Sequence, residues 1–243
     1  MTYVMSDIHG YLNLFNSILR KVHFSDDDSL YVLGDVIDRG PDGIKILLKI
    51  MRSKNMFMVI GNHEYMMLQY FLGDKKDFFH ALANWASNGC DPTIKQFKSY
   101  AESTQNRILR FVKNLPIEYR LEINGRKYIL CHSQPAVSSF KKKPIMIFSY
   151  TNETEFSVWC RERIKDENFN NLTIIHGHTP VFNYDKYAQS ENNIYFSSGE
   201  INVDCGCAVI DYLNNRYRGR LGCLRLEDMK EYYLENIKTN IKM

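Results

Sequence analysis

The chain has 243 residues, of which 44% are hydrophobic and 24% are charged, and its formal net charge is +3. These values are ordinary for a globular protein with a hydrophobic core, and they exclude an intrinsically disordered chain. The small net charge predicts no nucleic-acid or membrane partner, and no apolar run approaches the roughly 18 residues that cross a membrane. Because the first ten residues lack the basic start of a signal peptide, we expect a single cytoplasmic domain over residues 1–243.

The N-terminal part of the chain repeats one pattern of strand, polar loop and helix three times. Apolar runs predict strands at 3–5, 30–33 and 57–60. Apolar residues at helical spacing predict helices at 12–19, 44–51 and from 62 to 68. This alternation favours parallel strands joined by helical crossovers. Functional sites of such sheets form at the carboxyl ends of the strands, which is where all three polar loops fall.

Residues 74–110 interrupt this pattern. They contain two or three helical pieces joined by a segment with Gly89 and Pro92. Because the strand-rich half of the chain resumes after them, we expect a helical cap inserted into the domain at about 74–110.

The C-terminal half is rich in predicted strands. Runs at 117–123 and 127–132 flank Asn124-Gly125, a pair typical of a type I′ hairpin. A strand at 173–176 ends in a polar Gly-His-Thr segment, and a helix is predicted at 156–164. Further antiparallel strands are predicted at 194–196, 201–210 and 220–226, with a turn at Asn214-Asn215.

Six side chains that commonly bind metals follow the predicted strands. They are Asp7, His9, Asp35, Asn62, His132 and His178. A mixed oxygen and imidazole set suits Mn²⁺, Fe or Zn²⁺ better than Ca²⁺, which prefers oxygen alone. Six ligands exceed what one catalytic ion needs, but they suffice for two divalent ions if Asp35 bridges them. Two such ions activate a water and bind the oxygens of a phosphate.

The same loops carry groups that suit a phosphate. Arg39 lies four residues after Asp35, and its planar guanidinium can bind two phosphate oxygens. Asn62 and His63 open a predicted helix, whose N-terminus favours an anion. We expect His63 to be the general acid for the leaving oxygen, with its pKa raised by the carboxylate of Asp38.

The specificity of these patterns differs. An isolated Asp-x-His is more often a turn, whereas Gly34-Asp35-x-x-Asp38-Arg39-Gly40 has a chance probability of roughly 10⁻⁴ in a chain of this size. His176 is expected to support the site without binding metal. The six cysteines show no CxxC spacing and are expected to be free and buried.

Taken together, these blocks resemble the calcineurin-like metallophosphoesterases. The matching segments are 7–10, 34–40, 61–64 and 177–179, and their order is that of the phosphoprotein phosphatases, most closely the bacterial and phage serine/threonine protein phosphatases. The resemblance implies an α/β fold, a four-layer α/β/β/α sandwich of two mixed sheets with a dinuclear centre at their edge.

The resemblance also implies roles for individual residues. Asp7, His9 and Asp35 would hold one ion, and Asp35, Asn62, His132 and His178 the other. Arg39, His63 and Asn62 would meet the phosphate, with Asp38 supporting His63. Trp159-Cys160-Arg161 resembles a block that supplies a second phosphate-binding arginine, here Arg161; otherwise Arg161 is a surface residue of an amphipathic helix.

Two segments depart from the family pattern. Ser133, Gln134 and Pro135 follow His132 where the family usually has glycine, and Cys90 replaces the second glycine of a Trp…Asn-Gly-Gly segment. The shapes of the pocket wall and of the cap therefore do not carry over from the family.

Three functions remain in competition. The leading one is a manganese-dependent phosphatase acting on phosphoserine and phosphothreonine in proteins and on small phosphomonoesters. The second is a symmetrical diadenosine tetraphosphate hydrolase, which shares the metal motifs. The third is a phosphate-binding module without catalysis, which we disfavour because no ligand or general acid is missing.

Overall fold

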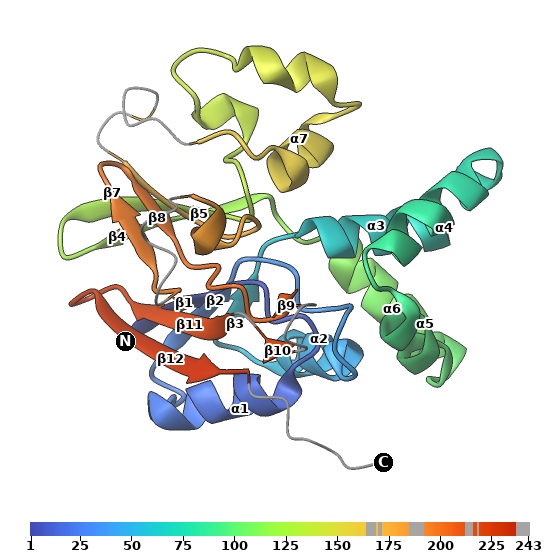
Figure 1. Cartoon of the computed structure of the whole chain (residues 1–243), viewed down its shortest axis with the longest axis horizontal. Helices are drawn as coiled ribbons and strands as arrows, with labels where there is room; N and C mark the ends of the chain where they lie inside the picture. Colours follow the sequence, from blue (N-terminus) through green and yellow to red (C-terminus); the bar gives the residue numbers. More distant parts are fainter. Residues whose placement is uncertain (164–168, 170–171, 185–191, 212–215, 218, 237–243) are drawn as a thin grey trace.

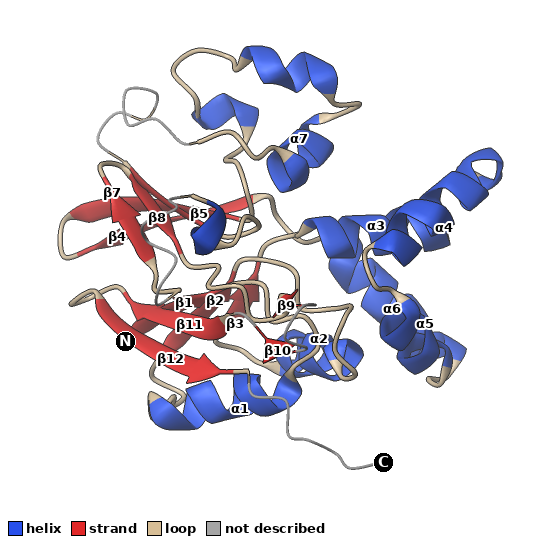
Figure 2. Ribbon diagram, viewed as in Figure 1, coloured by secondary structure: helices blue, strands red, loops and turns tan. Residues whose placement is uncertain are grey.

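Two five-stranded sheets lie face to face in the computed structural model, with helices outside the first sheet and to one side (Figure 1; Figure 2). The structure describes residues 1–163, 169, 172–184, 192–211, 216–217 and 219–236. This arrangement confirms the predicted α/β sandwich of two mixed sheets.

The first sheet has the strand order β12–β11–β1–β2–β3. Its strands are β1 (Thr2–Met5), β2 (Ser29–Val32), β3 (Met56–Met58), β11 (Arg220–Arg225) and β12 (Lys230–Glu235). The three N-terminal strands are parallel, as predicted, whereas β11 is antiparallel to both β1 and β12. The sequence pattern missed β12, whose side chains are at most half-buried and show no apolar run.

The second sheet has the strand order β4–β5–β6–β8–β7. Its strands are β4 (Glu118–Ile123), β5 (Arg126–Cys131), β6 (Thr173–His176), β7 (Tyr195–Ser197) and β8 (Glu200–Asn202). β5, β6 and β8 are parallel, and the antiparallel strands β4 and β7 form the two edges. The short strands β9 (Ile210–Asp211) and β10 (Arg216–Tyr217) pair with each other.

The strand β1 contributes to both hydrophobic cores because successive side chains of a strand point to opposite faces. Tyr3 and Met5 face the core shared with the helices, and Val4 faces the core between the sheets. Val4 meets side chains of the second sheet there, such as Leu130 and Ile175. The two sheets are therefore held together by a fully apolar layer.

Helices α1 (Leu12–Lys21) and α2 (Gly43–Arg52) cover the outer face of the first sheet (Figure 1). Phe15, Ile18 and Leu19 form the buried stripe of α1 at the predicted helical spacing. Both helices carry basic residues in their last turn, which complements the helix dipole.

A group of helices projects from the sheets on the side of the strand ends (Figure 1). It contains α3 (Asn62–Leu72), a short turn at Lys75–Asp77, α4 (Phe78–Ser87), α5 (Asp91–Lys98) and α6 (Glu102–Lys113). The predicted helical pieces within 74–110 are therefore present. Their assignment as a cap within a single domain stays a prediction.

Residues 132–163, which follow β5, run above the second sheet (Figure 1). Their helical parts are Val137–Ser139, Ile145–Ser149 and α7 (Glu153–Trp159), and Val181–Asn183 follows β6. Phe140 and Phe169 pack against Ile129 and Ile174 of the second sheet. The outer face of that sheet is thus also covered.

Two predicted elements are wrong in extent. The strand expected at 201–210 breaks after Asn202, because the Asp204 side chain accepts a hydrogen bond from Gly206 N and the chain turns with a φ of +74° at Gly206. The helix expected at 156–164 is α7, which ends at Trp159; Ile164 and the turn at Asn214-Asn215 lie outside the described residues.

The described helices include none long and apolar enough to span a membrane. All six cysteines are buried and free, as predicted.

Candidate active site

The predicted site residues meet at one edge of the two sheets. Asp7 and His9 follow β1, Asp35 follows β2, and Asn62 opens α3 directly after β3. His132 and His178 follow β5 and β6 of the second sheet. All six are buried. The carboxyl ends of strands from both sheets thus supply one constellation.

The backbone of this site is unusual in its conformation. A positive φ is uncommon for residues other than glycine, and the described chain has ten such residues. Six of the ten belong to the site, namely Asp7, His9, Asp35, Asp38, Arg39 and His178. Backbone held in this region concentrates at functional sites, where surrounding structure maintains the strain.

Two motif glycines allow the loops to approach each other. A Cβ on Gly61 would lie 2.2 Å from Asp35 Oδ1, and one on Gly177 would lie 2.4 Å from Asp7 Oδ2. Any side chain there would push a predicted ligand out of place. The glycines of these motifs are therefore required by close packing around the carboxylates.

The first group of metal-binding side chains surrounds Asp35 and His9. His9 Nε2 lies 3.8 Å from Asp35 Oδ2 and 3.9 Å from Asp7 Oδ1. His63 Nε2 is also 3.8 Å from Asp35 Oδ2, so it lies beside the same group. Asp7 accepts a hydrogen bond from His178 N at 3.0 Å, which ties the two halves of the site together.

The second group shares Asp35 with the first. His132 Nε2 lies 3.6 Å from Asp35 Oδ1 and 2.9 Å from Asn62 Oδ1. The same Asn62 oxygen is 2.9 Å from His178 Nδ1. Asp35 is thus the residue common to both groups, the position that a bridging ligand needs.

The nitrogen and oxygen atoms that face one another in the site are arranged as ligands of divalent metals rather than as hydrogen-bond partners. His9 and His132 direct Nδ1 to the carbonyls of Ile37 and Leu33, at 3.0 and 2.7 Å, so their Nε2 lone pairs face oxygens of the site. A second ring nitrogen bonded to a backbone carbonyl is typical of metal-binding histidines. His178 instead directs Nδ1 into the site, 2.9 Å from Asn62 Oδ1. Cations beside Asp35 would satisfy these inward-facing nitrogens.

The buried carboxylates of the site also indicate that positive charge would stabilise it. Burial, together with Asp7, raises the pKa of Asp35 to about 7, and burial next to Asp35 raises that of Glu64 to about 8. Burial and Asp7 raise the pKa of Asp204 well above its usual range. Several carboxylates held this close repel one another unless cations offset their charge.

His63 is held by Asp38. His63 Nδ1 lies 2.6 Å from Asp38 Oδ2, which also accepts a hydrogen bond from Trp85 Nε1 at 2.7 Å. Asp38 N donates to Thr93 Oγ1 at 2.8 Å. The predicted pairing of His63 with Asp38 is thus present. The other ring nitrogen of His63, Nε2, lies 3.2 Å from Arg39 Nη2.

The expectation that Asp38 raises the pKa of His63 is wrong. Burial lowers the pKa of His63 to about 4, and Arg39 adds to the effect, while Asp35 opposes it. Burial also raises the pKa of Asp38 to about 7, so this carboxyl offers less negative charge than an exposed one. Sequence reasoning counted the partner and missed the desolvation of both groups.

Arg39 and Arg161 face one polar cavity with a volume of about 200 Å³. His63, Asn88 and five of the six predicted metal-binding side chains also line it, namely Asp7, His9, Asp35, Asn62 and His178. Arg161 is exposed, and its Nη1 donates to His178 O at 3.3 Å and Thr179 Oγ1 at 3.1 Å. It lies two residues after the end of α7, so it is not part of a helix, although it is at the surface.

Sequence reasoning assigned no role to Glu64, although it stands in a matched motif. Its carboxylate accepts hydrogen bonds from Asp35 N, Val36 N and Gly61 N at 2.8, 3.0 and 3.1 Å. It therefore joins the loops after β2 and β3. Its position as the third residue of α3 is that of a capping box, a signal that could have identified it.

This chain is similar to a known protein family and to several known proteins. The family model described as calcineurin-like phosphoesterase matches residues 2–210. Serine/threonine-protein phosphatase 2 of Salmonella typhimurium is 25% identical over 205 residues, which cover 81% of this chain and 86% of that protein. The symmetrical bis(5'-nucleosyl)-tetraphosphatase of Wigglesworthia glossinidia brevipalpis is 41% identical over 76 residues, but they span 30% of this chain and 28% of that protein.

Solved structures share the fold at low sequence identity. A protein serine/threonine phosphatase from Saccharomyces cerevisiae has a TM-score of 0.58 and 17% identity, covering 98% of this chain and 80% of that chain. A metallophosphoesterase from Sphaerobacter thermophilus has a TM-score of 0.54 and 15% identity, covering 96% and 88%.

Proposed function

This chain belongs to the calcineurin-like phosphoesterase family, and from that premise we propose that it removes phosphate from phosphoserine and phosphothreonine in proteins. The observation that carries this proposal is the size and lining of the cavity. A volume of about 200 Å³ between two arginines suits a single phosphorylated side chain. It is smaller than the roughly 300–1,000 Å³ of sites that enclose a whole ligand.

In this proposal the two groups that share Asp35 hold two divalent ions. Asp7, His9 and Asp35 hold one, and Asp35, Asn62, His132 and His178 hold the other. When bound, the ions, which we expect to be manganese, supply a water of lowered pKa and offset charge on the phosphate. Glu64 keeps the loops that carry Asp35 and Asn62 in register, because it accepts hydrogen bonds from backbone amides of both.

The arginines orient the phosphate. Arg39 approaches from the loop of Asp35 and Arg161 from the opposite wall, so the anion is bound between two guanidinium groups that can each donate two hydrogen bonds. Asn62 opens α3, and the positive end of that helix adds to the attraction. The substrate is thereby held with its ester oxygen toward His63.

His63 then supplies the proton for the leaving oxygen. In the structure its Nε2 accepts from Arg39, and the low pKa keeps the ring neutral at pH 7. A bound phosphate dianion next to Nε2 would draw Arg39 onto itself and favour the imidazolium. Asp38 and Trp85 fix the orientation of the ring throughout. Proton donation is thus coupled to the presence of the anion.

A single comparison of substrates tests the proposal. The manganese-loaded protein is given a phosphoserine peptide and diadenosine tetraphosphate at equal concentrations, and the release of phosphate and of nucleotide is measured. We expect the higher kcat/KM for the peptide. A preference for the dinucleotide would reject protein phosphatase activity, and no turnover of either substrate or of a chromogenic ester would indicate a binding module.

The second candidate is a symmetrical tetraphosphatase. It is favoured by the 41% identity to the Wigglesworthia protein, although that match covers 30% of this chain. The match to the Salmonella phosphatase extends over 81% of the chain and so includes most of the residues that shape the site. We therefore rank protein phosphatase activity first.

A further inference from the structure

A large groove lies away from the active site. It has a volume of about 1150 Å³ and runs between α1 and α2. We call it the α1–α2 groove. Its lining includes His23 and Ser25, which lie between α1 and β2, Ser53, which lies between α2 and β3, and Met56, the first residue of β3. It therefore reaches the end of the sheet opposite to the site, which lies where these strands end.

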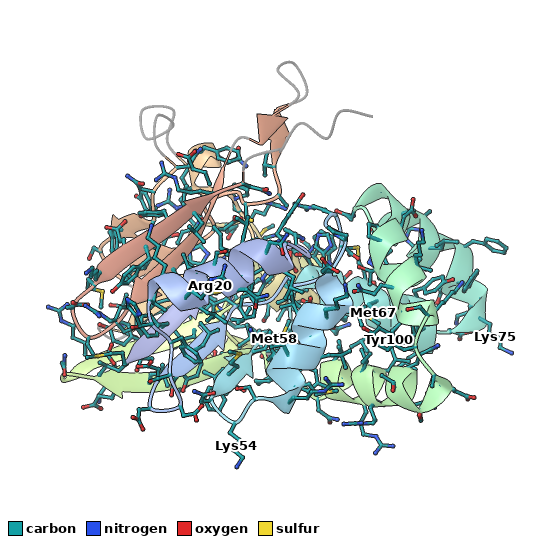
Figure 3. The ribbon with its side chains drawn as sticks, turned by 90° about the horizontal axis from the view of Figure 1, so that it is seen from below. Arg20, Lys54, Met58, Met67, Lys75 and Tyr100 are labelled. Carbon is teal, nitrogen blue, oxygen red and sulfur yellow. The ribbon has the colours of Figure 1, made fainter. Side chains whose placement is uncertain are left out.

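Four basic side chains line this groove. Arg20 comes from α1, and Lys45, Lys49 and Arg52 follow one another along α2. All four are exposed. Figure 3 looks onto this side of the molecule, with Arg20 labelled on α1 and Tyr100 at the edge of the projecting helices. The mouth of the groove is thus a row of cations.

The positive charge of this row is largely uncompensated. Lys45 forms an ion pair with Asp42, which lies outside the lining, at 2.6 Å, and Asp26 is the acidic residue of the groove wall. Among the residues that the structure describes, no carboxylate forms an ion pair with Arg20, Lys49 or Arg52; Arg20 and Lys49 bind the neutral side chains of Ser17 and Asn16 instead. Burial and the nearby Arg20 lower the pKa of Lys49, as expected where no anion is present.

The floor of the groove is apolar. Leu19 and Leu48 are 8% and 6% exposed, and Phe24 and Met56 are partly buried beside them. A free phosphate would use the cations and leave this floor in water. A ligand with both carboxylates and apolar side chains would cover the cations and the floor together.

The spacing along α2 matches an extended peptide. Residues four apart on a helix are about 6 Å apart along its axis, which is the spacing of Lys45 and Lys49. Alternate residues of an extended chain are about 6.6 Å apart and point to the same side. Acidic residues at alternate positions would meet the cations in turn, and the residues between them would point away from the row.

We propose that the α1–α2 groove is a docking site for an acidic, extended segment of a partner protein, with carboxylates at alternate positions. Naming that partner a phosphoprotein substrate rests on the proposed function, but binding of the segment itself does not. The groove would hold a substrate by a segment remote from its phosphate. This would raise its local concentration without using the small catalytic cavity for selectivity.

The test is binding of a fluorescent, unphosphorylated 12-residue peptide, with Asp at alternate positions and Leu or Ser between, to the full metal-loaded chain. We expect Lys49→Glu combined with Arg52→Glu to weaken binding about tenfold or more, since two attractive pairs become repulsive. Lys75→Glu, at the far end of the projecting helices, is the matched control and should change nothing (Figure 3). Turnover of a chromogenic ester should be equal in all variants, which shows that they fold.

Three results would overturn the proposal. They are equal binding of a peptide with Asn in place of Asp, equal loss in the Lys75→Glu control, and tighter binding of a 12-nucleotide single-stranded DNA than of the peptide. If the double reversal does not fold, Lys49→Gln with Arg52→Gln replaces it and should still weaken binding several-fold. Because the peptide carries no phosphate, its binding can hold even if phosphopeptide turnover fails, so the two hypotheses are tested separately.

Discussion

The two walls of the active-site cavity are held in different ways. The wall formed by the loops after β1, β2 and β3 is buried except for Arg39, and Glu64 joins two of its loops through three backbone amides. The opposite wall consists of Arg161 and of residues 180–183 and 204–209, beside the predicted metal ligand His178. There Arg161 is exposed and is positioned by one carbonyl and one hydroxyl group.

This contrast indicates that the two walls have different functions. Buried, mutually bonded groups can hold ligands and a general acid at fixed positions, because every displacement breaks several hydrogen bonds. An exposed arginine with weak partners can move toward different substrates at little cost. We therefore expect substitutions in the first wall to abolish chemistry and those in the second wall to alter substrate binding.

The largest effect is expected at Asp35, which both metal-binding groups share. Asp35→Asn should reduce bound manganese from two ions per chain to one or none and remove turnover down to background, because the amide cannot offer two anionic oxygens. Metal analysis of the gel-filtered protein measures this directly. Two tightly bound ions in the variant, or a single ion in the fully active protein, would contradict the shared role.

His63→Asn should leave both metals bound and slow hydrolysis of alkyl phosphates by about 10²–10⁴-fold, the usual contribution of a positioned acid. A nitrophenyl phosphate should suffer less, because its leaving group needs no proton. Asp38→Asn should follow the same trend more weakly, since Asp38 affects the proton transfer only through its contact with His63. Rates for esters of increasing leaving-group pKa provide the measurement, and an equal loss for all of them would reject the general acid.

Substitution of the arginine in each wall tests this contrast directly. Arg39 is exposed like Arg161, but its Nη2 lies 3.2 Å from Nε2 of the buried His63. Arg39→Ala should therefore weaken inhibition by inorganic phosphate about 10–100-fold with both metals in place, through loss of a charge-assisted hydrogen bond. Arg161→Ala should change KM only a few-fold, because Arg161 bonds only a carbonyl and a hydroxyl group and an exposed pair contributes little. Inhibition constants for the two variants side by side test the contrast, and a larger effect at Arg161 would reverse it.

The smallest effect is expected at Glu200, a buried residue that supports the second wall. Glu200 is buried and bonds His176 Nε2 at 3.0 Å and Arg163 Nη2 at 2.8 Å. Burial alone would raise its pKa, but these partners lower it below its ordinary value of 4.5. A lowered folded pKa stabilises the protein above the unfolded pKa, and this contribution is lost as the pH falls through the folded pKa.

Glu200→Gln should accordingly lower the midpoint of thermal unfolding at pH 7 by a few degrees, about 2–4 °C for each kcal/mol in a chain of this length. The difference from the unsubstituted protein should shrink as the pH falls below about 4.5. Unfolding curves at matched pH values measure it. A difference independent of pH would assign the effect to packing, and unchanged chromogenic ester turnover would show that the first wall is intact.

Much of the first wall could be predicted from the sequence. Each of its groups lies within a few residues of the end of a strand, as in Gly34-Asp35-x-x-Asp38-Arg39-Gly40, so the motif and the strand pattern together indicate where the side chains lie. Parallel strands bring their carboxyl ends to one edge, which is why three local motifs predict one site. The fold class and the pairing of His63 with Asp38 follow from the same local information.

Only the tertiary structure decided the rest. The turn at residues 203–209 forms part of the second wall instead of the predicted strand, because Asp204 and Gly206 bend the chain. The low pKa of His63 comes from its burial in the folded chain, and no motif records desolvation. The α1–α2 groove likewise arises from helix packing. Sequence spacing determines which residues are neighbours along an element, whereas burial, charge environment and surface shape depend on which elements meet.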